Sequence, residues 1–306
     1  TSTRATAITS APTASRLSLV STPDRHLVYF GTETTIGTTT TQDNMYVRWS
    51  DQEDINTYTP TATNTAGTQR LADGTRIIGA IRGRDAIYIW TDNALFIMRF
   101  VGAPFTFSFQ QVGTGCGLIG KNAAVEVDGS AYWMSDNGFF RYTGKLESLA
   151  CLVEDYVFDD INTVPRQHIN AGLNNLFGEV TWFYASENAS SIDRAVTYNY
   201  MDSTPERPVW TTSSLARTTW QDSAIFGKPH ATEYDSSATS DGTVGNTDGV
   251  TTYYEHEKGF NQVKAGATSA IAANIESGDF DLDQQRGLGG DGEFMLKIRR
   301  IIPDFL

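Results

Sequence analysis

Two segments of the chain share one pattern, Tyr88-Ile89-Trp90-Thr91-Asp92-Asn93-Ala94-Leu95-Phe96 and Tyr132-Trp133-Met134-Ser135-Asp136-Asn137-Gly138-Phe139-Phe140. Each copy reads as a strand of aromatic and β-branched residues, an Asp-Asn pair with a small residue after it, and a second strand. Asp and Asn tolerate the left-handed backbone of a tight hairpin turn. The copies lie 44 residues apart, and a propeller blade of four strands takes about 40–45 residues. The pattern therefore predicts two hairpins in neighbouring blades of one β-propeller.

A weaker third copy, Trp182-Phe183-Tyr184-Ala185-Ser186-Glu187-Asn188, follows the second. A β-sandwich can also repeat a hairpin, so the repeat favours a propeller and leaves a sandwich as the alternative. Strand-like runs bounded by Gly, Asp or Asn surround the repeat, at residues 27–30, 45–49, 76–81, 86–91, 94–101, 105–112, 123–127, 131–135 and 139–142. The short gaps between these runs leave little room for crossover helices, which indicates antiparallel meanders.

The expected fold class is all-β, with propeller-like antiparallel meanders, long loops and between about five and seven blades. One short helix is predicted at 152–161, where apolar and acidic residues alternate with helical spacing. Residues 1–260 are expected to form the propeller body, with inserted loops around 203–248 that are rich in Thr, Ser, Asp, Gly and Pro. Residues 261–306 are expected to form a C-terminal β segment that completes or extends the body, with its strongest strand at 294–302.

The balance of charges is acidic, with 23 Lys and Arg against 36 Asp and Glu and a net charge of −13 over 306 residues. Basic residues gather only at Lys297, Arg299 and Arg300, so the sequence argues against a DNA-binding protein that neutralises phosphates. No apolar run is long enough to span a bilayer, and no apolar segment follows the N-terminus, so neither membrane insertion nor a signal peptide is expected. The two cysteines, Cys116 and Cys151, are expected to be free and buried.

Metal-binding patterns are weak throughout the chain. The histidines His26, His168, His230 and His256 are scattered, without metal-ligand spacing. On a strand, Glu255 and Glu257 would lie on the face opposite His256, so these three residues are not expected to hold one metal. The alternation of Asp279, Asp281 and Asp283 could offer three carboxylates to Ca²⁺, but it lacks the glycine and the distal glutamate of a helix-loop-helix calcium site.

Catalytic patterns are equally weak. The run Gly113-Thr114-Gly115-Cys116-Gly117, followed by Gly120-Lys121-Asn122, has the wrong spacing for a phosphate loop and is expected to connect two blades. The carboxylate pairs Glu154/Asp155 and Asp159/Asp160 could in principle hydrolyse glycosides, yet such pairs arise by chance among 36 acids. The six Trp residues are expected in the core. No catalytic residue, cofactor site or metal ligand is assigned, and the protein is not expected to be an enzyme.

A series of short segments follows in a fixed order along the chain: Trp49-Ser50-Asp51-Gln52-Glu53-Asp54, Asp73-Gly74, Ile77-Ile78-Gly79-Ala80, Trp90-Thr91-Asp92-Asn93-Ala94-Leu95-Phe96, Tyr132-Trp133-Met134, Gly138-Phe139-Phe140-Arg141-Tyr142-Thr143-Gly144, Val157-Phe158-Asp159-Asp160-Ile161-Asn162, Glu179-Val180-Thr181-Trp182-Phe183-Tyr184 and Ile301-Ile302-Pro303-Asp304-Phe305. In this order they resemble the tail nozzle proteins of short-tailed bacteriophages, also called packaged-DNA stabilisation or tail tubular B-type proteins. The resemblance spans roughly residues 25–305, and members of that family carry further sequence at both ends.

The resemblance implies a structural virion protein of the phage tail, assembled in the bacterial cytoplasm. Such a subunit has a β-propeller and joins a hexameric ring below the portal and adaptor proteins, next to distal tail components or fibres. The ring surrounds the exit channel, helps to retain packaged double-stranded DNA and conducts it during ejection without sequence-specific binding. A net charge of −13 per subunit fits a channel that repels phosphates.

Two other classes of protein remain open. A tail-associated polysaccharide-degrading enzyme would need two carboxylates about 5–10 Å apart in an open groove with exposed aromatic residues. A carbohydrate-binding propeller should repeat the same stacking aromatic residue in each blade. The aligned copies instead place Ile89 against Trp133, and Trp90 against Met134. This mismatch weakens the carbohydrate-binding interpretation.

Overall fold

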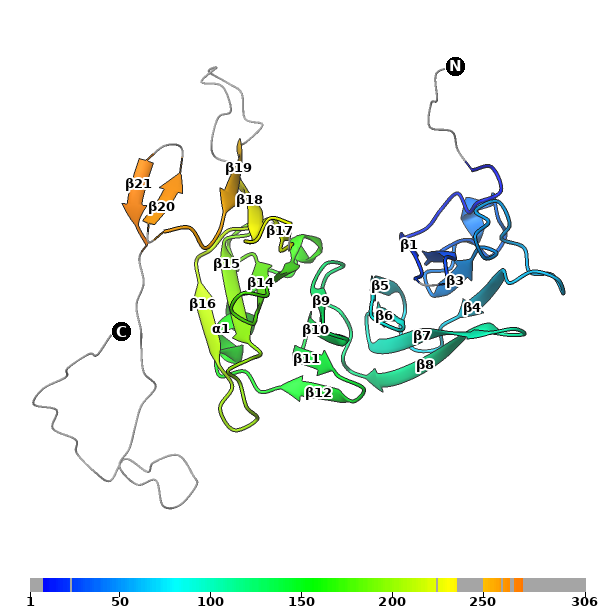
Figure 1. Cartoon of the computed structure of the whole chain (residues 1–306), viewed down its shortest axis with the longest axis horizontal. Helices are drawn as coiled ribbons and strands as arrows, with labels where there is room; N and C mark the ends of the chain where they lie inside the picture. The colour runs from blue at the N-terminus through cyan, green and yellow to red at the C-terminus, as the bar shows by residue number, and fades with distance from the viewer. Residues whose placement is uncertain are drawn as a thin grey trace, which may run out of the picture. The chain divides into compact units, whose positions relative to one another are not determined.

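The structure is a computed structural model that describes residues 8–22, 24–223, 225–235, 250–259, 261–264 and 267–271. The chain divides into two compact units, Thr1–Lys258 and Gly259–Leu306. Strands dominate both units over the described residues, as the sequence predicts (Figure 1). None of the described helices is long and apolar enough to cross a membrane. The expected strand at 294–302 lies outside the described residues.

Four sheets of the first unit are meanders of four consecutive strands, in which each strand pairs antiparallel with the next one along the chain. The first two sheets contain β1 (Leu17–Val20), β2 (Leu27–Phe30), β3 (Tyr46–Trp49) and β4 (Gly67–Arg70), then β5 (Ile77–Arg82), β6 (Ile87–Thr91), β7 (Ala94–Gly102) and β8 (Thr106–Thr114). The next two contain β9 (Ala124–Val127), β10 (Ser130–Ser135), β11 (Gly138–Tyr142) and β12 (Leu146–Leu149), then β13 (Asn170–Asn174), β14 (Glu179–Tyr184), β15 (Arg194–Asn199) and β16 (Trp210–Ser213). This succession is the meander of propeller blades, so the all-β, propeller-like prediction is confirmed.

A fifth sheet of three strands ends the described part of the first unit. It contains β17 (Thr219–Gln221), β18 (His230–Asp235) and β19 (Val250–Glu255). The stretch expected as inserted loops thus also holds β16, β17 and β18, while residues 236–249 lie outside the described residues. In the second unit, β20 (Asn261–Lys264) pairs antiparallel with β21 (Ala267–Ala270).

Both Asp-Asn pairs form hairpin turns, as predicted. Asp92 and Asn93 join β6 to β7, where Trp90 pairs with Leu95, and Asp136 and Asn137 join β10 to β11, where Ser135 pairs with Gly138. The two hairpins belong to different sheets. In the weaker third copy, β14 ends at Tyr184 and β15 begins only at Arg194, so a longer connection replaces the tight turn.

Aromatic residues from the repeat pack the core between the second and third sheets. Trp90 and Trp133 are fully buried, and their rings meet edge to face at 5.3 Å between centroids. The Tyr88 hydroxyl donates to the Gly129 carbonyl at 3.0 Å, which joins the second sheet to the β9–β10 turn of the third. Aromatic side chains supply a large buried area each, so these contacts hold successive sheets together.

Hydrogen bonds from indole N–H groups also link successive sheets. Trp182 in β14 donates to the carbonyl of Ala123, next to β9, at 3.0 Å. Trp220 in β17 donates to the carbonyl of Leu173 in β13 at 2.8 Å. A Cβ atom on Gly172 would lie only 2.5 Å from the Trp220 ring, so the absence of a side chain there lets the indole reach β13.

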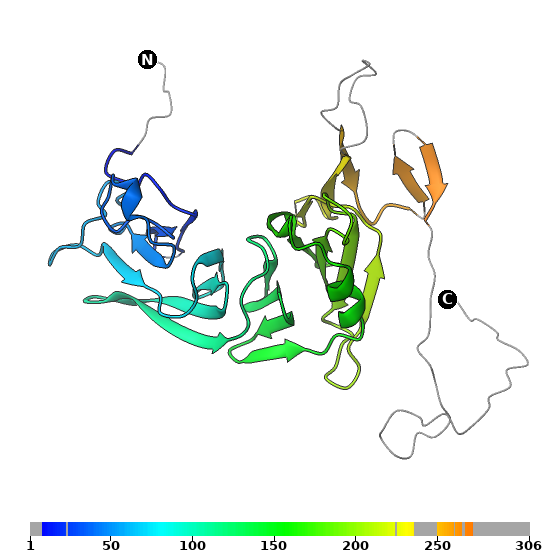
Figure 2. The ribbon, with the colours of Figure 1, turned by 180° about the vertical axis from the view of Figure 1, so that it is seen from behind.

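The predicted helix is α1 (Glu154–Asp160), in the connection between β12 and β13 (Figure 2). Val157 is fully buried, and Phe158 packs against Phe139 at 5.5 Å between ring centroids. Glu154 and Asp155 occupy the first turn, where negative charge is favourable. Two short 3-10 helices, η1 (Thr39–Thr41) and η2 (Arg166–His168), complete the described helices.

Both cysteines are free, as expected, and Cys116 is buried. Cys151 is only half-buried, which differs from the expectation, because it precedes the exposed start of the α1 connection. Burial raises the pKa of both thiols, that of Cys151 to about 12. A thiol that stays protonated is a poor nucleophile.

Candidate functional site

The histidines lie in different parts of the described chain, except that His230 and His256 are neighbours in the fifth sheet region. His26 is fully buried, with its Nε2 3.1 Å from the Thr65 hydroxyl and its ring beside Phe107. His256 accepts a hydrogen bond at Nε2 from the Arg217 Nε–H at 2.9 Å. Over the described ranges, no group of three or more His, Cys, Asp or Glu residues is placed to hold a metal ion. The acids Asp279, Asp281 and Asp283 lie outside those ranges.

The His256 site is a buried polar cluster of the fifth sheet. Arg217 forms an ion pair with Glu233 at 3.4 Å, and its guanidinium lies over the Tyr254 ring at 4.0 Å. Burial, together with the neighbouring Arg217 charge, lowers the pKa of His256 to about 4. A neutral imidazole that accepts from Arg217 joins the segment before β17 to the segment after β19, so this cluster stabilises the fold.

The glycine-rich run after Gly113 connects the second sheet to the third, as expected. Cys116 donates its N–H to the Asn93 carbonyl at 3.0 Å, and a Cβ atom on Gly117 would lie 2.3 Å from the Asp92 carbonyl oxygen. The run therefore packs against the β6–β7 turn and leads into β9. A phosphate loop would instead open a helix at this point.

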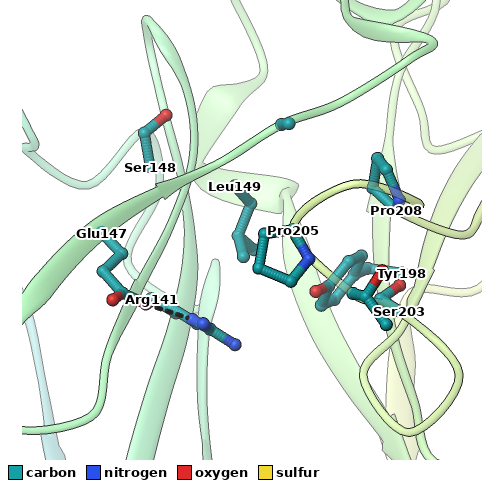
Figure 3. A pocket seen from close by; sticks show the side chains of 10 residues that line it. Arg141, Glu147, Ser148, Leu149, Tyr198, Ser203, Pro205 and Pro208 are labelled. Atoms are coloured by element: carbon teal, nitrogen blue, oxygen red, sulfur yellow. Dashed lines mark hydrogen bonds and ion pairs between the residues drawn. The ribbon is translucent and has the colours of Figure 1, made fainter.

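One surface hollow lies between the third sheet and the β15–β16 loop (Figure 3). It measures about 290 Å³, and ten residues line it: Arg141, Glu147, Ser148, Leu149, Ala150, Tyr198, Ser203, Thr204, Pro205 and Pro208. Arg141 and Glu147 pair at 2.7 Å across β11 and β12. Burial opposes the charge of Arg141, but Glu147 raises the pKa of its guanidinium.

Hydroxyl groups, one ion pair and apolar side chains line this hollow. Its hydroxyl groups, on Ser148, Tyr198, Ser203 and Thr204, have no imidazole or thiol beside them in the lining. Its one carboxylate, Glu147, is held by Arg141, whereas glycoside hydrolysis needs a second carboxylate. Leu149, Pro205 and Pro208 supply the apolar part of the wall (Figure 3).

A second hollow lies over α1, lined by Asp155, Tyr156, Asp159, Asp160 and Arg194. Arg194 pairs with Asp160 at 3.4 Å. Asp155 and Asp159 are exposed one helical turn apart, and Tyr156 is 54% exposed. The sequence gives no reason to treat these carboxylates as more than pairs that arise by chance. In the structure, the exposed side chain of Tyr156 lies beside them.

A basic group at one end of the second sheet is not evident as a cluster in the linear sequence. Arg82 is the last residue of β5, and Arg84 lies in the β5–β6 turn. Arg99 lies in β7, next to Met98, which pairs with Ile87 at the start of β6. All three side chains are exposed, and within the described part of the chain none forms an ion pair. Arg82 pairs with Ile87 and Ile87 with Met98, so Arg82 shares a face of the sheet with Met98, and Arg99 lies on the opposite face. In the sequence, the segment Arg82-Gly83-Arg84 could have indicated two of these arginines, whereas the position of Arg99 depends on strand register.

The tryptophans lie in the core, as predicted. Trp49, Trp90, Trp133 and Trp182 are buried, and Trp210 and Trp220 are half-buried against other aromatic rings. None of these six indoles is exposed as a stacking surface for sugars.

No protein-family model matches this chain, and no curated protein matches it either.

Proposed function

We propose that this protein is a structural subunit of a short-tailed phage tail, a nozzle protein that forms a ring around the DNA exit channel. The observation that carries the proposal is the ordered series of sequence segments that resembles the nozzle family. These segments fall on the successive blades: Trp90 to Phe96 spans the β6–β7 hairpin, Tyr132 to Met134 lies in β10, and Glu179 to Tyr184 is β14. A resemblance carried by the repeated structural unit itself supports a shared architecture.

The side-chain chemistry of the described residues supports a passive role. The hollow beside Arg141 offers a single, paired carboxylate, the half-buried His256 accepts a hydrogen bond from Arg217, and burial raises the pKa of both thiols. A chain of net charge −13 repels phosphates. In the proposed ring, this protein contacts the adaptor or portal proteins and the distal tail, and it helps to retain and conduct the packaged DNA.

Imaging of intact virions tests the proposal. A short tag on an exposed turn, for example after Gly144 in the β11–β12 turn, marks the subunit without touching the core. We expect tagged density in a ring around the tail channel, below the portal. A tag found only on lateral fibres, or a free monomer that degrades a bacterial polysaccharide, would contradict the proposal and favour a tail-associated enzyme.

A further inference from the structure

The β7–β8 hairpin differs from every other part of the four-stranded sheets. Both strands are nine residues long, whereas the other strands of these sheets have four to six residues. At the hairpin end, β6 pairs with β7 only as far as Met98. Residues from Arg99 onward therefore extend beyond β6, where β8 pairs with them and His26 packs against Phe100 at 5.9 Å between ring centroids.

The projecting end is apolar and open. Phe100, Val101 and Phe105 are 43%, 54% and 77% exposed. From Phe107 to Gly113, β8 carries no charge and no proline, and its outer edge pairs with no other described strand. Natural proteins usually protect such an edge with charges, prolines or a covering element. Exposed apolar clusters of this kind mark interaction surfaces.

The same end carries three exposed arginines and one exposed acid, Asp85, in an acidic protein. Arg82, Arg84 and Arg99 are exposed, and within the described ranges they have no ion-pair partner. Arginine and aromatic residues are the types enriched in protein–protein interfaces. The composition therefore favours an acidic protein partner that also presents apolar side chains.

The α1 surface of this chain has the complementary composition. Asp155 and Asp159 are exposed, and no described cation pairs with either of them. Leu152 is 77% exposed and Tyr156 54% exposed beside them. The hollow over α1 gives space for a projecting side chain.

We propose that the β7–β8 hairpin end of one copy docks on the α1 surface of a second copy of this chain. Arg84 and Arg99 then face Asp155 and Asp159, and Phe105 packs near Tyr156 and Leu152. The two surfaces are unlike, so the contact is heterologous, and such a contact generates a ring when its rotation closes. The inference rests on the proposed ring for its biological setting and names the surfaces that build it.

Charge reversal with purified full-length protein tests the docking. Arg84→Glu with Arg99→Glu should weaken self-association about 100-fold or more, because like charges then face each other. Asp155→Lys with Asp159→Lys should do the same. Mixing the two double variants brings opposite charges together again and should restore assembly. Sedimentation velocity over a concentration series measures each dissociation constant.

Two further variants complete the test, the first as a control and the second as a test of the apolar contact. Lys121→Glu with Arg76→Glu makes the same change of net charge as the double arginine variant, at exposed positions outside both surfaces, and should leave self-association within about threefold of the wild type. Phe105→Ser removes an exposed apolar side chain without a change of charge and should weaken association at least tenfold by loss of an aromatic anchor, about 1.4 kcal/mol.

The outcomes separate this inference from the proposed function. If both charge-reversed proteins still assemble like the wild type, the docking surfaces are wrong, and rings in virions would leave the nozzle proposal standing. If mixing fails to restore assembly of two folded variants, the pairing of these two surfaces is wrong. If Arg84 and Arg99 instead confer salt-sensitive binding of a short DNA duplex, the basic end is a nucleic-acid contact and the inference is overturned.

Discussion

At the scale of single residues, His256 shows how the fold controls a titratable group. The sequence places it among Tyr254, Glu255 and Glu257, a setting that suggests a surface cluster. In the structure its Nε2 accepts from Arg217, and burial and the arginine charge lower its pKa to about 4. In the unfolded chain an ordinary histidine has a pKa of about 6.5, so the unfolded state binds the proton more readily.

This difference predicts a pH dependence of stability. As pH falls from about 6.5 to about 4, the unfolded chain gains a proton that the folded His256 resists, so the free energy of unfolding should drop by up to about 3 kcal/mol. Urea unfolding across this pH range measures the slope. His256→Gln should flatten it, while the exposed His168→Gln serves as a matched control and should not. An unchanged slope in His256→Gln would mean that other groups cause the effect.

At the scale of elements, the two Asp-Asn hairpins look alike in sequence but are held differently. Asp92 accepts the backbone N–H of Thr75 at 2.7 Å and the Thr75 hydroxyl, which joins the β6–β7 turn to the connection before β5. Burial opposes the charge of Asp92, but these hydrogen bonds lower the pKa of its carboxyl group. Asp136 is more exposed and forms one ion pair, with Arg166 at 3.3 Å.

The comparison predicts unequal effects of one substitution. Asp92→Ala should reduce the free energy of unfolding by about 1–3 kcal/mol, because it leaves the Thr75 groups without their acceptor. Asp136→Ala should cost less than about 1 kcal/mol, as is usual for a partly exposed ion pair. Denaturant unfolding of both variants at neutral pH measures the difference. Equal losses would show that the turn itself, and not its hydrogen bonds to the connection, governs stability.

At the scale of the whole molecule, the acidic charge separates a conduit from a DNA-binding protein. The assembled protein should show no tight affinity for duplex DNA, because its net negative charge repels phosphates. A protein that binds through several phosphates would instead lose affinity by about 10³–10⁵ between 50 and 200 mM salt. Titration of a short duplex at both salt concentrations measures this. Tight binding at low salt that Lys297→Glu with Arg299→Glu abolishes would mean that the C-terminal segment grips DNA, and the conduit interpretation would be wrong.

Local patterns in the sequence determined the strands around the repeat, both Asp-Asn turns, the short helix α1 and the burial of the tryptophans. These features depend on neighbouring residues, whose alternation and turn chemistry are visible along the chain. Only the tertiary structure decided which residues gather from distant positions. Strand register places Arg99 at the same end of the second sheet as Arg82 and Arg84. The hollow beside Arg141 needs a loop from another sheet, and His256 meets Arg217 because β17, β18 and β19 form one sheet. Such groupings arise from long-range packing, in which each contact depends on the register of the sheets between.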